Sequence, residues 1–133
     1  ILASIIEKEA GNNDEKKLIA SVFLKRLDLG MKLQADPTVK FALNKPQLKR
    51  VLRKHLSYDS PYNTYLYEGL PPGPIYIPEP SVIDAVLNYE KHNYIYMCAE
   101  PSYKANHSFA VTYNEHLKNY NKYKNWLNSQ GIN

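Results

Sequence analysis

Residues 1–11, ILASIIEKEAG, begin the chain with the stretch on which the rest of the fold depends. Its apolar residues share one face when successive positions are set about 100° apart: Ile1, Leu2, Ile5, Ile6 and Ala10. Glu9 projects into the middle of that face, whereas Glu7 and Ser4 project to the opposite side. We therefore predict an amphipathic helix whose two carboxylates have different roles.

Glu9 is the candidate catalytic residue. Loss of water disfavours the charged form of a carboxyl group set among isoleucines, so such a group can keep a proton near neutral pH. A general acid needs that proton to protonate a poor leaving group, such as the oxygen of a glycosidic bond. In the structural alternative, Glu9 pairs with a lysine or arginine or lies at an exposed helix end.

The chain has 133 residues, enough for one domain with its own core, and it contains no apolar run close to the roughly 20 residues of a membrane span. No signal-peptide pattern is present. Because the sequence starts without Met inside an apolar helix, we expect a fragment of a longer protein whose upstream part is absent. The expected unit is a single domain over residues 1–133.

Metal and cofactor sites are not expected. The single cysteine, Cys98, excludes an internal disulfide and a cysteine metal cluster, and the four histidines lack the spacing of a zinc helix. His107 lies between two expected strands, where it could hydrogen-bond a substrate or have a structural role. The net charge of +4 suits nucleic acid, anionic lipid or an acidic polymer without choosing among them.

Hydrophobic spacing predicts a mainly helical α+β fold with about five helices and a small two- or three-stranded β element. After the first helix we expect a core helix that begins at the capping pair Asn12 and Glu15, runs through Leu29 and is stopped by Gly30. The further expected helices are a short one over 37–43, a basic amphipathic one over 45–55, one from Ser81 and a last one from the capping box of Thr112 and Glu115. The expected strands are 94–99 and 108–111. A nucleic-acid groove reader on the basic helix is disfavoured, because no helix-turn-helix or aromatic platform accompanies it.

Two loop segments carry candidate sugar-binding residues. Asp36 is expected to cap the short helix, whereas Gln34 is a polar residue between two apolar ones without an evident structural role. The proline-rich segment 57–80 contains Asn63 and Tyr65. Aromatic faces stack on sugar rings and amides bond their hydroxyl and N-acetyl groups, so this stiff loop suits a glycan. In the structural alternative, the loop caps the core and its tyrosines pack inward.

Five strings occur in one order along the chain: ASIIEKEA (3–10), VFLKRL (22–27), GMKLQADPTVKFAL (30–43), YNTYLYEGLPPGPI (62–75) and NHSFAVTYNEH (106–116). Together they closely resemble the endolytic murein transglycosylase family, the MltG/YceG-like enzymes of bacteria. The resemblance extends from Ile1 to about His116, nearly the whole chain.

The resemblance implies a lysozyme-like catalytic domain that cleaves peptidoglycan between N-acetylmuramic acid and N-acetylglucosamine, without a cofactor. The cut leaves a 1,6-anhydro sugar and ends strand elongation. The resemblance also implies that Glu9, the second acid of the E-K-E string, is catalytic, and that Gln34, Asp36, Asn63 and Tyr65 line the glycan cleft. The implied parent protein has an N-terminal domain and one inner-membrane anchor, with this domain on the periplasmic or extracellular side. Its implied partners are glycan strands and, through the absent part, cell-wall synthases and the membrane; nucleic acid is not expected.

Two alternatives stay open. A lysozyme-like hydrolase would end the reaction with water and would need a second acid such as Asp36. A non-catalytic peptidoglycan-binding module would not need Glu9. Product mass distinguishes the hydrolase from a transglycosylase, because the anhydro product of a transglycosylase is lighter by one water. Survival of intact strands would indicate the binding module.

Overall fold

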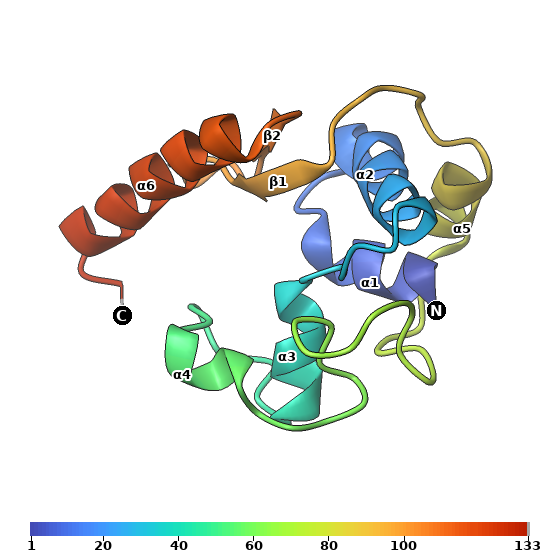
Figure 1. Ribbon diagram of the computed structural model, residues 1–133, viewed down its shortest axis with the longest axis horizontal. Coiled ribbons are helices and arrows are strands. Elements are labelled where there is room, and N and C mark those ends of the chain that lie inside the picture. The colour runs from blue at the N-terminus through green and yellow to red at the C-terminus, as the bar shows by residue number, and fades with distance from the viewer. Residues whose placement is uncertain (133) are drawn as a thin grey trace.

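Helix α1 (Leu2–Glu9) lies at the centre of the computed structural model, which describes residues 1–132 (Figure 1). It packs against α2 (Lys16–Asp28), α3 (Asp36–Ala42) and α5 (Pro80–Leu87). The core they enclose consists of Leu2, Ile5, Ile6, Ile19, Ala20, Phe23, Leu33, Ala35 and Val82. Burial of apolar surface, at about 25 cal/mol per Å², is the main stabilising contribution of such a core.

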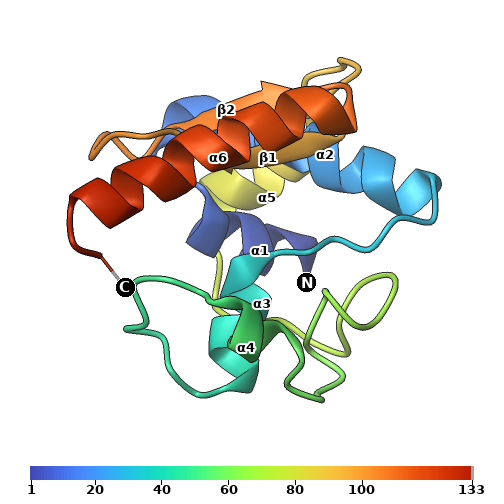
Figure 2. The same ribbon diagram turned by 60° about the vertical axis from the view of Figure 1, so that its left-hand side comes forward.

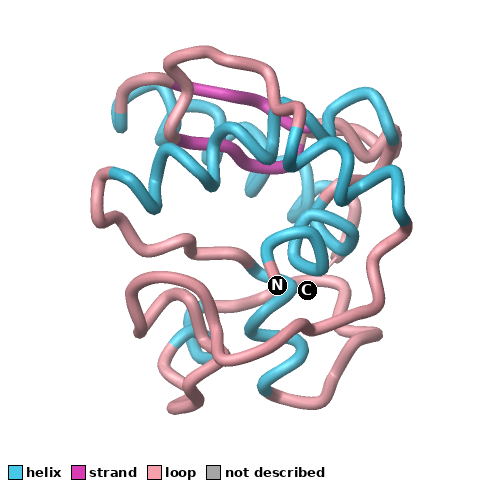
Figure 3. Tube along the Cα trace, turned by 90° about the vertical axis from the view of Figure 1, so that its right-hand side faces the viewer, coloured by secondary structure: helices cyan, strands magenta, loops and turns pink. Residues whose placement is uncertain are grey.

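The other elements surround this core. The 3₁₀ turn η1 (Asn13–Glu15) joins α1 to α2, and the one-turn helix α4 (Arg53–Leu56) interrupts the long connection from α3 to α5. Strands β1 (Tyr96–Ala99) and β2 (His107–Ala110) follow α5, and α6 (Tyr113–Ser129) comes last. The strands lie at one end of the molecule and much of the α3–α5 connection lies at the other (Figure 3). The predicted α+β class with a helical majority is confirmed.

The two strands form an antiparallel pair in which Tyr96 is opposite Ala110. Two strands alone are marginally stable, and here α6 packs across both of them (Figure 2). The start of α6 agrees with the predicted capping box, because the Thr112 hydroxyl accepts a hydrogen bond from the Glu115 amide at 3.2 Å. The hairpin and α6 thus form one wall of the molecule.

The basic helix predicted over 45–55 is wrong over most of its length, because only Arg53–Leu56 is helical. Beyond α3, Asn44 adopts a positive φ of 54°, which ends the helical backbone. The segment is then tied to the end of α6 by Arg50, whose Nη1 donates to the carbonyl oxygen of Ile132 at 2.9 Å. An amphipathic pattern is a weak predictor, which tertiary contacts of this kind can override.

Two predictions about single side chains also differ from the structure. Ser4, projected to the outer side of α1, is fully buried. Its hydroxyl donates to the Ile1 carbonyl at 2.6 Å and accepts from the Ile75 amide at 3.0 Å, so its burial leaves no polar group unpaired. Asp36 does not cap α3: it is the first helical residue, and the helix has no side-chain cap.

Candidate active site

A cleft with a volume of ≈ 290 Å³ lies between the end of α1, the start of α3, the hairpin and α6. Glu9, Asp36 and His107 are among its lining residues. They come from α1, α3 and β2, and so from distant parts of the chain. The cleft therefore brings together three of the six predicted site residues.

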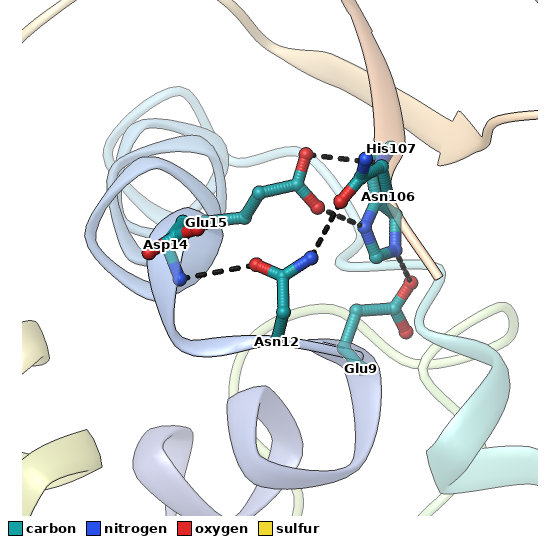
Figure 4. A network of polar contacts seen from close by, with 6 residues as sticks. All are labelled: Glu9, Asn12, Asp14, Glu15, Asn106 and His107. Carbon is teal, nitrogen blue, oxygen red and sulfur yellow. Dashed lines mark hydrogen bonds and ion pairs between the residues drawn. The ribbon is translucent and has the colours of Figure 1, made fainter. Parts of the chain in front are cut away.

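Glu9 is the last residue of α1, and its side chain is 18% exposed. One of its oxygens, Oε1, lies 3.3 Å from Nε2 of His107 (Figure 4). The His107 side chain itself is only 6% exposed. The predicted catalytic carboxyl is therefore largely withdrawn from water, opens on the cleft and touches a buried imidazole.

The imidazole of His107 lies between two carboxylates. Its Nδ1 is 2.9 Å from Oε1 of Glu15, and the other Glu15 oxygen, Oε2, accepts a hydrogen bond from the His107 backbone amide at 3.0 Å. Figure 4 shows Glu9 and Glu15 on the two sides of the ring. Because both ring nitrogens and the backbone amide have partners, the orientation of His107 is well determined.

The pKa of His107 reflects these two neighbours. Burial lowers it, but the hydrogen bonds and negative charges of Glu9 and Glu15 raise it by more, so the pKa lies above its ordinary value. A protonated imidazole donates from both nitrogens, which matches the two carboxylate partners. The geometry therefore favours an imidazolium whenever the carboxyl groups on both sides of the ring are ionised.

The turn after α1 and the tip of the hairpin are fixed to each other. The Asn12 side-chain amide donates to Oδ1 of Asn106 at 2.5 Å. At Gly11, a Cβ atom would lie 2.1 Å from Cβ of Ala105 and 2.6 Å from its carbonyl oxygen. Any larger residue at position 11 would push the two segments apart, so this glycine lets the hairpin bring its histidine to the end of α1.

Asp36 is the second carboxyl group in the cleft lining. The hydroxyl of Tyr65 donates a hydrogen bond to its Oδ1. Burial and then the charge of Glu9 raise the pKa of Asp36 to about 6, against the smaller opposing effects of the Tyr65 hydrogen bond and of Lys40. Burial and the adjacent Asp36 raise the pKa of Tyr65, which keeps this phenol a proton donor.

Asp36→Asn is expected to remove a pH-dependent part of the stability. The folded protein has a pKa of about 6 at Asp36, above the ordinary 3.8, so it retains this proton where the unfolded chain releases it. The resulting stabilisation is complete below about pH 4 and is lost by about pH 6, a change of about 3 kcal/mol. Asparagine cannot ionise and can still accept the hydrogen bond from Tyr65.

Denaturant unfolding of both proteins from about pH 4 to about pH 7 measures this effect. Over that interval, the free energy of unfolding of the variant should rise relative to that of the wild type. Asp28→Asn is the matched control, because Asp28 is an exposed carboxyl at the end of α2. Parallel pH curves for Asp36→Asn and the wild type would contradict the raised pKa.

Gln34 and Asn63 are not part of the cleft lining. Gln34 is exposed, with a positive φ of 51°. Asn63 is fully buried, and its amide donates to the carbonyl oxygens of Leu56 and Tyr58 at 3.0 and 2.9 Å. Asn63 therefore stabilises its own loop, and Tyr65 reaches the site through its hydrogen bond to the second carboxyl.

Glu15 is the site residue that sequence reasoning assigned to another role. It was expected to complete a capping pair with Asn12, whose side chain does accept from the Asp14 amide at 3.0 Å. The Glu15 carboxylate instead binds His107, which is 92 residues away along the chain. No local pattern signals a pair at that separation.

The model of the YceG-like family matches residues 1–122. A crystal structure of a yceG-like protein from Listeria monocytogenes superimposes with a TM-score of 0.83 at 46% sequence identity, covering 89% of this chain and 38% of that one.

Two curated relatives bear the name endolytic murein transglycosylase. The one from Bacillus subtilis (strain 168) is 44% identical over 122 residues, which are 92% of this chain and 33% of the relative. The one from Streptococcus pneumoniae serotype 2 is 35% identical over 103 residues, which are 74% of this chain and 19% of the relative. The chain thus spans a third or less of the length of these two relatives.

Proposed function

Because this chain belongs to the YceG-like family, we propose that it is the catalytic part of an endolytic murein lytic transglycosylase. Its substrate is then the peptidoglycan strand, cut between N-acetylmuramic acid and N-acetylglucosamine. The observation that carries the proposal is the placement of Glu9, a carboxyl group 18% exposed, in a cleft beside an imidazole and a second carboxyl. A carboxyl group so placed can act as the acid on a glycosidic oxygen.

The reactive form in the first proposed step carries a proton on Glu9 as well as on His107. Its Glu9 carboxyl donates that proton to the oxygen between the two sugars. The bond from that oxygen to C1 of the muramyl residue breaks, and positive charge develops at C1. Glu9 is then a carboxylate, which the imidazolium of His107, 3.3 Å away, stabilises. An ionised Asp36 in the same cleft would stabilise the positive sugar.

In the second proposed step, the Glu9 carboxylate accepts the proton of the C6 hydroxyl of the same sugar while O6 attacks C1. The products are a 1,6-anhydro end and a free hydroxyl on the departing N-acetylglucosamine, and Glu9 has regained its proton. One carboxyl can serve both steps, because the nucleophile belongs to the substrate.

A hydrolase is the second candidate function, and one observation favours it: Asp36 lines the same cleft as Glu9. An inverting hydrolase needs two carboxyl groups, one of which activates water. In that case the cleavage product would contain an oxygen atom from the solvent.

Mass spectrometry of purified glycan strands treated with the protein in ¹⁸O-labelled water tests the proposal. A transglycosylase yields ends lighter by one water and without the label. Label in the new ends would indicate the hydrolase, and intact strands would indicate a binding module.

The proposed cellular role is to end the elongation of nascent strands at the outer face of the inner membrane. In this proposal a single-pass anchor in the upstream part of the parent protein holds the domain there, close to cell-wall synthases. Fractionation of cells that express the full-length protein tests the location. Recovery in the soluble fraction after cell lysis would contradict it.

A further inference from the structure

Positive charge gathers around the cleft. Four of the cationic side chains in its lining come from two facing parts of the chain: Lys40, Lys49 and Arg50 on one side and Lys124 on the other. Within residues 1–132, no carboxylate forms an ion pair with any of these four. The fifth of these cationic side chains is engaged elsewhere, because Lys8 has its ammonium group 3.8 Å from the centre of the Tyr76 ring. The four cations outnumber the two carboxylates of the lining, so the cleft attracts anions.

Arg50 is held in a fixed position. Its Nη1 donates to Oδ1 of Asn128 at 3.1 Å and to the carbonyl oxygen of Ile132 at 2.9 Å, and the residue is only partly exposed. Within residues 1–132, its Nε and Nη2 form no hydrogen bond. A guanidinium group so immobilised keeps a planar set of donors free, which matches the two oxygens of a carboxylate.

Lys49 and Lys124 complete the arrangement. Lys49 precedes Arg50 in the segment between α3 and α4, and Lys124 lies on α6, the helix to whose end Arg50 is tied. Both lysines are exposed, so their ammonium groups are free to turn toward a bound anion. A ligand in the cleft would therefore meet positive charge on both sides.

We propose that Lys49, Arg50 and Lys124 form a subsite for a carboxylate group of the substrate. The inference rests on the proposed function, because the N-acetylated sugar rings are neutral and the muramyl residue is the one that carries an acidic substituent. The carboxylate has two sources: the lactyl group of muramic acid in peptide-free strands, or the free carboxyl groups of the peptide attached to it. The subsite makes the cleft selective for muramyl strands over neutral polymers of N-acetylglucosamine.

Equilibrium binding to the Glu9→Gln protein tests the subsite without cleavage of the ligand. The probes are peptide-free muramyl strands, the same strands with their lactyl carboxyl groups converted to amides, and peptide-bearing strands. In a Glu9→Gln background, Lys49→Gln combined with Lys124→Gln should weaken binding of at least one carboxylate-bearing probe by about 10-fold at moderate salt. Binding of the amidated strands should change by less than about twofold.

Lys122→Gln is the matched control, because Lys122 is an exposed lysine of α6 that does not line the cleft. Arg50→Lys keeps the charge but loses the planar donors, and should weaken binding of the same probe. If the lysine substitutions weaken binding of peptide-free strands alone, the bound carboxylate is that of the lactyl group. If they weaken binding of peptide-bearing strands alone, it belongs to the peptide.

Equal loss of affinity for amidated and carboxylate-bearing strands, or no loss for either, would overturn the subsite. A failure of the subsite can be distinguished from a failure of the proposed function. A wild-type protein that binds strands and never cleaves them refutes the enzyme and leaves the subsite standing. A wild-type protein that cleaves muramyl strands, and whose Lys49→Gln/Lys124→Gln variant binds every probe normally, refutes the subsite alone.

Discussion

Glu9→Gln is expected to lower the rate of anhydro-product formation by about 10³-fold while the fold is preserved. Glutamine has nearly the same volume, and its side-chain oxygen can still accept a hydrogen bond from Nε2 of His107, which lies 3.3 Å from Oε1 in the wild type. It cannot supply a proton to the leaving oxygen or take one from the C6 hydroxyl. Both proposed steps therefore fail, although the fold and the cleft are expected to stay in place.

Release of anhydro-muropeptides, followed by mass spectrometry, measures this loss, and circular dichroism with thermal unfolding checks the fold. Glu7→Gln is the control on the same helix. Glu7 contacts Lys16 at 3.7 Å and accepts a hydrogen bond from the Glu79 amide at 3.3 Å, and it does not line the cleft. Its loss should change the rate by less than about twofold. A normal rate for Glu9→Gln would remove Glu9 from the mechanism.

The apolar face of α1 followed from the sequence because it depends mainly on helical geometry, although Ser4, projected to the other side, is buried as well. An apolar stripe at helical spacing determines which side of α1 packs inward, and Ile5 and Ile6 are indeed fully buried. Two other predictions of this local kind agree with the structure: the capping of α6 by Thr112 and the end of α2 near Gly30, which has a φ of 69°. Each depends on residues within one or two turns of each other.

The rest of the site depends on contacts between distant segments, which no local pattern encodes. The pairing of Glu15 with His107 exists because the hairpin closes onto the turn after α1, where Gly11 leaves room for it. In the irregular path before α4, Arg50 binds Asn128 near the end of α6 and Ile132 just beyond it. The amphipathic pattern over 45–55 contains no sign of these contacts, and only Arg53–Leu56 is helical in this region.

His107→Gln is expected to lower the catalytic rate by about 10²-fold. The imidazole contacts Glu9 through Nε2 and Glu15 through Nδ1, and a glutamine amide presents one nitrogen in place of these two. Glu9 therefore loses the group that orients it and the positive charge that balances its carboxylate form. The loss should appear in kcat more than in KM, because His107 acts on the catalytic carboxyl.

The same substitution should change how stability depends on pH. Burial opposes the charged form of His107, but Glu9 and Glu15 outweigh it and raise the pKa. A histidine whose folded pKa exceeds the ordinary 6.5 contributes stability that is complete below pH 6.5 and is lost as the pH rises through the folded value. The difference in free energy of unfolding between wild type and His107→Gln should therefore be largest near about pH 6 and shrink toward about pH 9.

Chemical denaturation across that pH range measures the difference, and two further variants show whether it comes from the carboxylate partners. Glu15→Gln keeps the contact between His107 and Glu9. The difference in free energy of unfolding between wild type and Glu15→Gln should therefore also shrink as the pH rises, but by less than the difference for His107→Gln. Asp14→Asn alters an exposed neighbour of Glu15, and its free energy of unfolding should depend on pH as that of the wild type does. If the wild-type advantage over His107→Gln stayed constant from about pH 6 to about pH 9, His107 would be an uncharged packing residue. Glu9 would then act without a cationic partner.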